Sequence, residues 1–194
     1  MTRVLAVLAH PRKDSLTGTL FYKTVEHMRA AGATVDVLDL YDRAKDILFY
    51  DANLKDAHAP FFEENKERFM AADRIFIVYP IFWYAVPGIM KCWIDLVTSY
   101  AFTYGPQDST TFSNYALPKH SIKRALVVNS AAMSNWFRWL RTRNSGTEMV
   151  KETLKFLGIW DYAFYEIGST TKLTPERVKK HQEKILKKSE WLIS

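Results

Sequence analysis

The chain has 194 residues, 48% of them hydrophobic and 25% charged, and its net charge is +6. These proportions are typical of one soluble globular domain over residues 1–194, long enough to bury a substantial core. No apolar run approaches the roughly 20 residues that cross a bilayer, so we do not expect an integral membrane protein. The single cysteine, Cys92, excludes an intramolecular disulfide. We therefore expect a cytoplasmic protein without a signal peptide.

Taken in chain order, short apolar runs alternate with amphipathic stretches. Five apolar runs predict buried strands: Val4–Ala9, Thr34–Leu40, Arg74–Tyr79, Arg124–Asn129 and Trp160–Gly168. The stretches between and after them predict helices: Leu16–Ala31, Pro60–Ala72, Val86–Ser99, Thr147–Leu157 and a last one that begins at Pro175 behind an N-cap at Thr174. This alternation favours a parallel sheet with helices on both faces, and the spacing suits five strands in the order 2-1-3-4-5, the flavodoxin-like α/β arrangement. The two longest connections, Tyr41–Ala59 and Ala101–Lys123, are candidates for functional loops.

Hydroxyl side chains gather in the turn after the first strand, which reads "HPRKDSLTGTL" from His10 to Leu20. In an open α/β sheet, ligands bind beyond the carboxyl ends of the strands where the strand order reverses, which here is beside the first strand. The free backbone N–H groups at the start of the next helix, together with the hydroxyls of Ser15, Thr17 and Thr19, predict a phosphate site. The turn has one glycine and matches neither the dinucleotide fingerprint nor the P-loop. In the alternative interpretation, Ser15 only caps the helix and the other hydroxyls are solvated.

A cluster of aromatic residues follows the third strand at the same edge of the sheet, in "YPIFWYAVPG" from Tyr79 to Gly88. Phe82, Trp83 and Tyr84 stand where polar loop residues are usual. An apolar wall beside a phosphate site suits a planar, phosphorylated ligand such as a flavin nucleotide. In the alternative interpretation, these rings pack in the core or in an interface.

Three segments, "HPRKDSLTGTL", "YPIFWYAVPGIMKCWID" and "FTYG", resemble the flavodoxin-like NAD(P)H:quinone oxidoreductases. That family includes FAD-dependent quinone reductases and the smaller FMN-dependent flavoproteins that accompany bacterial potassium-efflux systems. The resemblance implies a bound flavin and NADPH or NADH as the electron donor. The short chain favours FMN, with FAD as the alternative. It also implies a homodimer in which Tyr104 of one subunit helps to close the substrate pocket of the other.

The resemblance assigns flavin contacts position by position. The residues that match the phosphate turn are His10, Ser15, Leu16, Thr17 and Thr19. Those that match the segment along the isoalloxazine ring are Pro80, Ile81, Phe82, Trp83 and Tyr84. Those that match the contacts to the pyrimidine edge are Asn129, Ser130, Ala131 and Ala132. Trp136, after the fourth strand, joins Tyr104 as a candidate for the substrate pocket.

The chain departs from the family's pattern at several positions. After the fourth strand the family usually has Thr-Thr-Gly-Gly, whereas this chain has "NSAA", and the family's usual glutamine in the aromatic segment is Phe82. Ala131 and Ala132 can donate their N–H groups to flavin N1 and O2 only if their φ is negative. The loop Met133–Gly146 contains no histidine or tyrosine, so the Tyr/His pair that assists some quinone reductases has no evident counterpart.

The same loop contains Arg138, Arg141 and Arg143, which are candidates for binding the nucleotide phosphates. Such contacts would favour NADPH over NADH. The alternative is a basic loop that is simply solvated.

The implied activity is ping-pong hydride transfer, in which NAD(P)H reduces flavin N5 and a quinone or similar acceptor is then reduced by two electrons. We assign no catalytic side chain. A regulatory subunit that binds flavin and activates a membrane transporter, with little turnover of its own, is the alternative. No two histidines have zinc-ligand spacing, so no metal is expected. The basic stretch Pro175–Lys188 has apolar residues at helical spacing, which indicates a solvated helix face rather than a nucleic-acid site.

Overall fold

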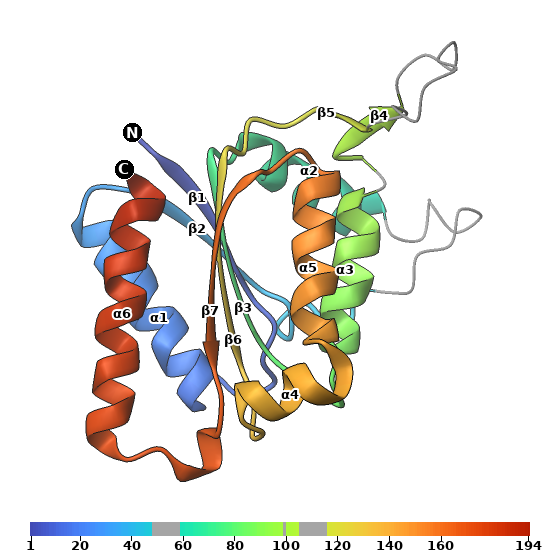
Figure 1. Ribbon diagram of the computed structural model, residues 1–194. Coiled ribbons are helices and arrows are strands. Elements are labelled where there is room, and N and C mark those ends of the chain that lie inside the picture. Colours follow the sequence, from blue (N-terminus) through green and yellow to red (C-terminus); the bar gives the residue numbers. More distant parts are fainter. Residues whose placement is uncertain (48–58, 99, 105–115) are drawn as a thin grey trace.

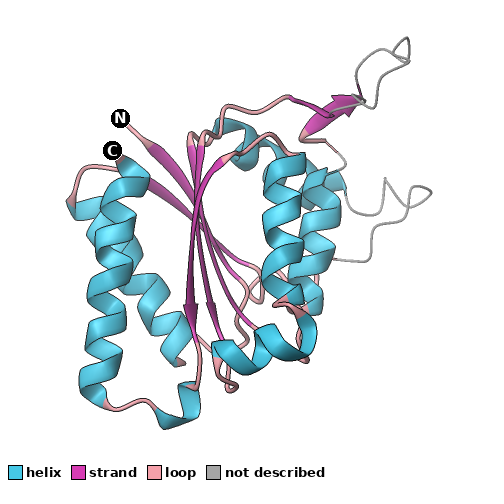
Figure 2. Ribbon diagram, in the orientation of Figure 1, coloured by secondary structure: helices cyan, strands magenta, loops and turns pink. Residues whose placement is uncertain are grey.

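The computed structural model describes residues 1–47, 59–98, 100–104 and 116–194. Its centre is a parallel sheet of five strands in the order β2-β1-β3-β6-β7 (Figures 1 and 2). The strands are β1 (Arg3–Leu8), β2 (Thr34–Asp39), β3 (Arg74–Pro80), β6 (Arg124–Ser130) and β7 (Asp161–Ile167). Because these are the five predicted strands in the order 2-1-3-4-5, the expected flavodoxin-like α/β fold is confirmed.

Helices cover both faces of this sheet (Figure 1). They are α1 (Leu16–Ala30), α2 (Ala59–Ala71), α3 (Gly88–Thr98), α4 (Asn135–Thr142), α5 (Ser145–Phe156) and α6 (Pro175–Ile193), with a 3₁₀ turn, η2, at Thr170–Lys172. Helices α1 and α6 lie on one face, and α2, α3 and α5 on the other. Alternate residues of β1 enter the two cores, Leu5 and Val7 on the α2–α3–α5 side and Val4 and Ala6 on the α1–α6 side. Burial on both faces explains why each strand reads as a continuous apolar run.

Helix α4 is a correction to the sequence interpretation, which reads residues 133–146 as a loop and starts the next helix at Thr147. Ser134 caps α4, because its Oγ accepts a hydrogen bond of 3.3 Å from the N–H of Phe137. Arg143 and Asn144, with left-handed φ angles of 53° and 58°, then separate α4 from α5. Because most apolar side chains of α4 are exposed, no core-facing periodicity marks it in the sequence.

The long connection at 101–123 contains two short strands that the sequence analysis did not predict. They are β4 (Phe102–Tyr104) and β5 (Ala116–Pro118), which pair antiparallel. Residues 105–115 of that candidate functional loop, and residues 48–58 of the one at 41–59, lie outside the described residues. The N-cap at Thr174 is confirmed, since its side chain accepts from the N–H of Arg177.

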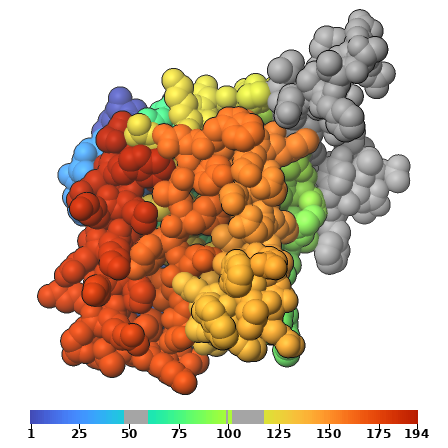
Figure 3. All heavy atoms as spheres, viewed as in Figure 1, coloured from blue at the N-terminus to red at the C-terminus, as the bar shows by residue number. Residues whose placement is uncertain are grey.

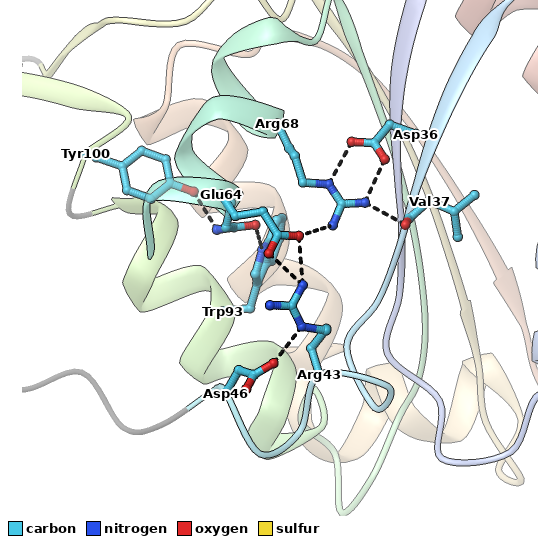
Figure 4. Close-up of polar contacts among 9 residues, drawn as sticks. Asp36, Val37, Arg43, Asp46, Glu64, Arg68, Trp93 and Tyr100 are labelled. Atoms are coloured by element: carbon cyan, nitrogen blue, oxygen red, sulfur yellow. Dashed lines mark hydrogen bonds and ion pairs between the residues drawn. The ribbon is translucent and has the colours of Figure 1, made fainter. Parts of the chain in front are cut away.

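Buried and half-buried polar side chains tie α2 to its neighbours (Figure 4). Asn65 is fully buried and donates to the hydroxyl of Tyr100 at 2.6 Å, while its Oδ1 accepts from Nε1 of Trp93 at 2.9 Å. Beside it, Arg68 donates to Asp36 in β2 at 2.6 Å. Helix α2 is therefore held by matched polar contacts as well as by apolar packing.

Replacing Asn65 by leucine would leave the indole N–H of Trp93 and the hydroxyl of Tyr100 buried without partners. We expect the free energy of unfolding to fall by about 2–4 kcal/mol, since each unsatisfied group costs about 1–3 kcal/mol. Urea denaturation measures this loss. Glu67→Ala, at an exposed position of the same helix, is the control; equal stability of the two variants would contradict the expectation.

Candidate functional site

Three turns meet at the carboxyl edge of the sheet, where β1, β3 and β6 end side by side. They are His10–Ser15 after β1, Ile81–Ala85 after β3 and Ala131–Ser134 after β6. The N–H of Ile81 donates to the carbonyl of Ser130 at 2.7 Å, and Ser130 Oγ lies 2.7 Å from Thr17 Oγ1 in α1. The structure thus brings together the three segments that the sequence assigns to one ligand.

The first turn presents free donors at the start of α1. Ser15 caps the helix as the alternative interpretation states, its Oγ accepting from the N–H of Gly18 at 3.0 Å. The N–H groups of Leu16 and Thr17 make no hydrogen bond within the described part of the chain. Thr17 is buried and Thr19 is exposed. Because the helix dipole adds positive charge at its N-terminus, this end of α1 favours an anion.

His10 lies beside these donors as a neutral ring. Its Nδ1 accepts from the N–H of Arg12 at 3.0 Å and lies 3.1 Å from Ser15 Oγ. Partial burial lowers the pKa of His10 below its usual 6.5, because desolvation disfavours the charged ring. With Nδ1 an acceptor, the proton is on Nε2, which gives the turn a further N–H donor.

The aromatic segment forms a strained two-residue turn. Phe82 and Ala85 exchange backbone hydrogen bonds of 2.9 and 3.0 Å, and between them Trp83 and Tyr84 have left-handed φ angles of 49° and 67°. Turns of this kind usually contain Asn and Gly, because other residues are strained there. Trp83 is nonetheless 94% exposed, so packing of its ring against the described residues does not compensate the strain. Strain combined with exposure of a large ring points to a ligand-binding role.

Helix α5 supports this turn from behind. Ser145 Oγ donates to the carbonyl of Tyr84 at 2.7 Å. A Cβ on Gly146 would lie 3.0–3.1 Å from Ile81, Ala85 and Tyr84, so only glycine lets the helix approach this closely without displacement. The turn is therefore held in place despite its strain.

The turn after β6 replaces the family's glycines without strain, because neither Ala131 nor Ala132 is among the described residues with positive φ. Ala131 is buried, and its N–H already donates to the carbonyl of Ile167 at 2.8 Å. Ala132 is exposed and takes part in no hydrogen bond with the described residues. Of the two N–H groups expected for flavin N1 and O2, that of Ala132 is free for a ligand.

Arg138 contradicts both interpretations of its loop, since it neither meets solvent nor lies open to a nucleotide phosphate. It is 1% exposed and donates to Glu166 Oε1 at 3.2 Å, Asn135 Oδ1 at 2.9 Å and Asn129 Oδ1 at 3.2 Å. Glu166 also accepts from Thr147 Oγ1 at 2.5 Å. This network fixes Asn129 at the end of β6 and Asn135 at the start of α4, so it positions the turn between them.

Glu166 is the residue of this network that the sequence analysis missed. An acid inside the otherwise apolar strand β7 is a signal for a buried cationic partner, because an unpaired buried charge is costly. Sequence alone does not say which of the chain's cations that partner is.

Other candidates lie apart from the buried network. Trp136 is 68% exposed on α4, which lies on the surface at the carboxyl edge (Figure 3). Arg141 and Arg143 are exposed and lie over the rings of Phe137 and Trp139. Tyr104 ends β4, and its side chain lies outside the described residues.

The described ranges contain neither a candidate metal site nor a candidate membrane span. There, no group of three or more His, Cys, Asp or Glu side chains is arranged for a metal ion. No helix in the same part of the chain is long and apolar enough to span a membrane.

A family model described as the flavodoxin-like fold matches residues 2–189, and the chain belongs to this family. A ribosyldihydronicotinamide dehydrogenase-like protein of Penicillium crustosum is 31% identical over 149 residues, which are 65% of this chain and 56% of the fungal protein. The chain thus spans little more than half of that relative. An FMN-dependent NADH:quinone oxidoreductase of Bradyrhizobium diazoefficiens is 26% identical over 191 residues, with 88% of each chain covered. A solved structure of an FMN-dependent NADH-azoreductase from Bacillus anthracis, in complex with FMN, shares the fold with a TM-score of 0.79, at 20% identity over all of both chains.

Proposed function

We propose that this protein is an NAD(P)H-dependent flavoprotein oxidoreductase that binds FMN and reduces a quinone-like acceptor by ping-pong hydride transfer. The observation that carries the proposal is the strained, exposed turn at Trp83 and Tyr84 beside the free N–H groups of α1. The planar part of a phosphorylated ligand would cover the aromatic rings of this turn. Its phosphate would accept hydrogen bonds from the N–H groups at the start of α1. The relatives named as FMN-dependent oxidoreductases support the flavin and the two-electron chemistry.

Each turn has a role in this proposal. The N–H groups of Leu16 and Thr17, with Nε2–H of His10, would hold the phosphate, and the N–H of Ala132 would donate to the pyrimidine edge. Trp83 shields the ring from water. A bound flavin would supply the two-electron redox chemistry between NADPH or NADH and the acceptor.

The test is the absorbance spectrum of the purified protein from 300 to 550 nm, with FMN or FAD added, before and after NADPH or NADH is supplied without air. We expect FMN to be retained, the yellow colour to bleach, and added benzoquinone to restore it over repeated cycles. Protein that takes up neither flavin contradicts the proposal. Protein that binds flavin and reduces no quinone favours the alternative, a flavin-binding regulatory subunit of a membrane transporter.

We also propose a homodimer, in which Tyr104 of one subunit contributes to the substrate pocket of the other. Phe82, Trp83 and Trp136 are exposed at the carboxyl edge and would be covered in such an assembly. Light scattering coupled to gel filtration at micromolar concentration should give twice the chain mass. A monomeric mass would rule out the shared pocket.

A further inference from the structure

A cavity beside the turn after β6, with which it shares Ser134, is lined mainly by β7, the segment after it and the first half of α6. Its volume is about 380 Å³, within the roughly 300–1,000 Å³ range of small-molecule sites. Tyr165 and Leu173 give it apolar surface, and Ser134 and Ser169 bring hydroxyl groups. The cavity is thus large enough for a small metabolite and has both polar and apolar walls.

Cations dominate the α6 wall of this cavity. Arg177, Lys180 and Lys184 line it from positions three and seven residues apart, which places them on one face of the helix. The side chains of these three residues make no hydrogen bond or ion pair with another described residue, although the backbone N–H of Arg177 donates to Thr174 Oγ1. By contrast, Lys151 and Lys155 on α5 each bind a glutamate one turn away. Among the described residues, the cations on this face of α6 have no such carboxylate partners.

Among the described residues, Glu166 is the one carboxylate that lines the cavity, and it is neutralised from its other side. Arg138 donates to its Oε1 at 3.2 Å, and Thr147 donates to the same oxygen at 2.5 Å. Glu176 and Glu183, the nearest acids on α6, do not line the cavity. The cavity therefore has a net positive charge.

The pKa of His181, in the middle of the cluster, is affected by that charge. Its Nδ1 lies 2.8 Å from the hydroxyl of Tyr165. Burial lowers the pKa of His181, and the neighbouring charges of Lys184, Arg177 and Lys180 lower it further. The imidazole is thus neutral at pH 7, and the positive potential is set by the three longer side chains.

We propose that this cavity binds a small molecule through a phosphate or diphosphate group. Three uncompensated cations that converge on one volume, with hydroxyl groups beside them, match the several charge-assisted hydrogen bonds that phosphate oxygens accept. The site is separate from the phosphate turn at the start of α1. It adjoins the turn after β6, because Ser169 and Thr170 donate to the carbonyls of Met133 and Ala131, each at 3.0 Å.

The experiment is a calorimetric titration of inorganic pyrophosphate into the protein with excess FMN present, which keeps the probe from the turn at the start of α1. Lys180→Ala/Lys184→Ala is compared with Lys179→Ala/Lys187→Ala, which removes the same charge from the same helix outside the cavity. We expect the first pair to raise the Kd at least about tenfold and the second to change it by less than about twofold.

Two results would overturn the proposal. The first is absence of pyrophosphate binding by the unaltered protein, and the second is equal weakening by both pairs, which would indicate general attraction to a basic helix. Lipid headgroups are the other possible source of the phosphate group. Sedimentation with phosphatidylcholine vesicles, with and without phosphatidylserine, tests for binding to them. Binding to the anionic vesicles that depends on Lys180 and Lys184, without pyrophosphate binding, would assign a lipid surface instead of a small molecule.

Discussion

Replacing Arg138 by methionine is expected to lower the free energy of unfolding by about 3–5 kcal/mol, because it leaves the charge of Glu166 without its partner. The guanidinium of Arg138 is almost fully buried, and the substitution also removes its hydrogen bonds to Asn129 and Asn135. A domain with a total stability of about 5–15 kcal/mol would be left close to the unfolding threshold. Urea denaturation at pH 7 measures the loss.

Two further variants test whether the loss of stability comes from the unpaired charge of Glu166. Arg141→Met, an exposed position of the same helix, should change stability by less than about 0.5 kcal/mol. Arg138→Met/Glu166→Gln removes both charges and should recover part of the loss, because a neutral amide is cheaper to bury than a carboxylate. A double variant less stable than the single one would contradict this account of the pair.

The second large effect is expected at Gly18, where alanine should disrupt the phosphate turn. A Cβ at this position would lie 2.3 Å from the carbonyl oxygen and 2.8 Å from the carbonyl carbon of Lys13, both backbone atoms. The turn or the start of α1 must therefore move, which costs about 1–3 kcal/mol for overpacking. The same movement displaces the N–H groups of Leu16 and Thr17, so we expect FMN affinity to fall at least about tenfold.

The matched control is Gly88→Ala at the start of α3, where a Cβ would meet nothing within 4 Å. Its stability and FMN affinity should equal those of the unaltered protein. Fluorescence titration of FMN and thermal unfolding give the two quantities independently. Gly18→Ala with full stability and full affinity would show that the turn accepts a Cβ and does not position the phosphate.

Much of the candidate site follows from local sequence patterns. Continuous apolar runs indicate strands buried on both faces, and the order of such strands determines which loops meet at the carboxyl edge. The segments around Ser15 and Trp83 are predicted to meet there, and in the structure they do. The aromatic residues are recognisable in the sequence because exposed loops rarely contain three in succession.

The conformation of the aromatic turn does not follow from its residues. Trp83 and Tyr84 are disfavoured in the left-handed region, so sequence rules predict a different backbone there. Their φ angles are imposed by the hydrogen bonds between Phe82 and Ala85 and by the close approach of Gly146. The contact with Gly146 and Ser145 joins two segments about sixty residues apart, which a local pattern cannot represent.

The sequence by itself determined the strand order, the edge of the sheet where we propose that a ligand binds, and the two segments that meet there, because burial is encoded in patterns of neighbouring residues. Only the tertiary structure decided that Arg138 is buried against Glu166 and that Ala132 rather than Ala131 has a free N–H. In the sequence Arg138 is one arginine among three in the loop after β6. Its role is set by a carboxylate 28 residues away on the neighbouring strand, which becomes its partner only when β6 and β7 pair.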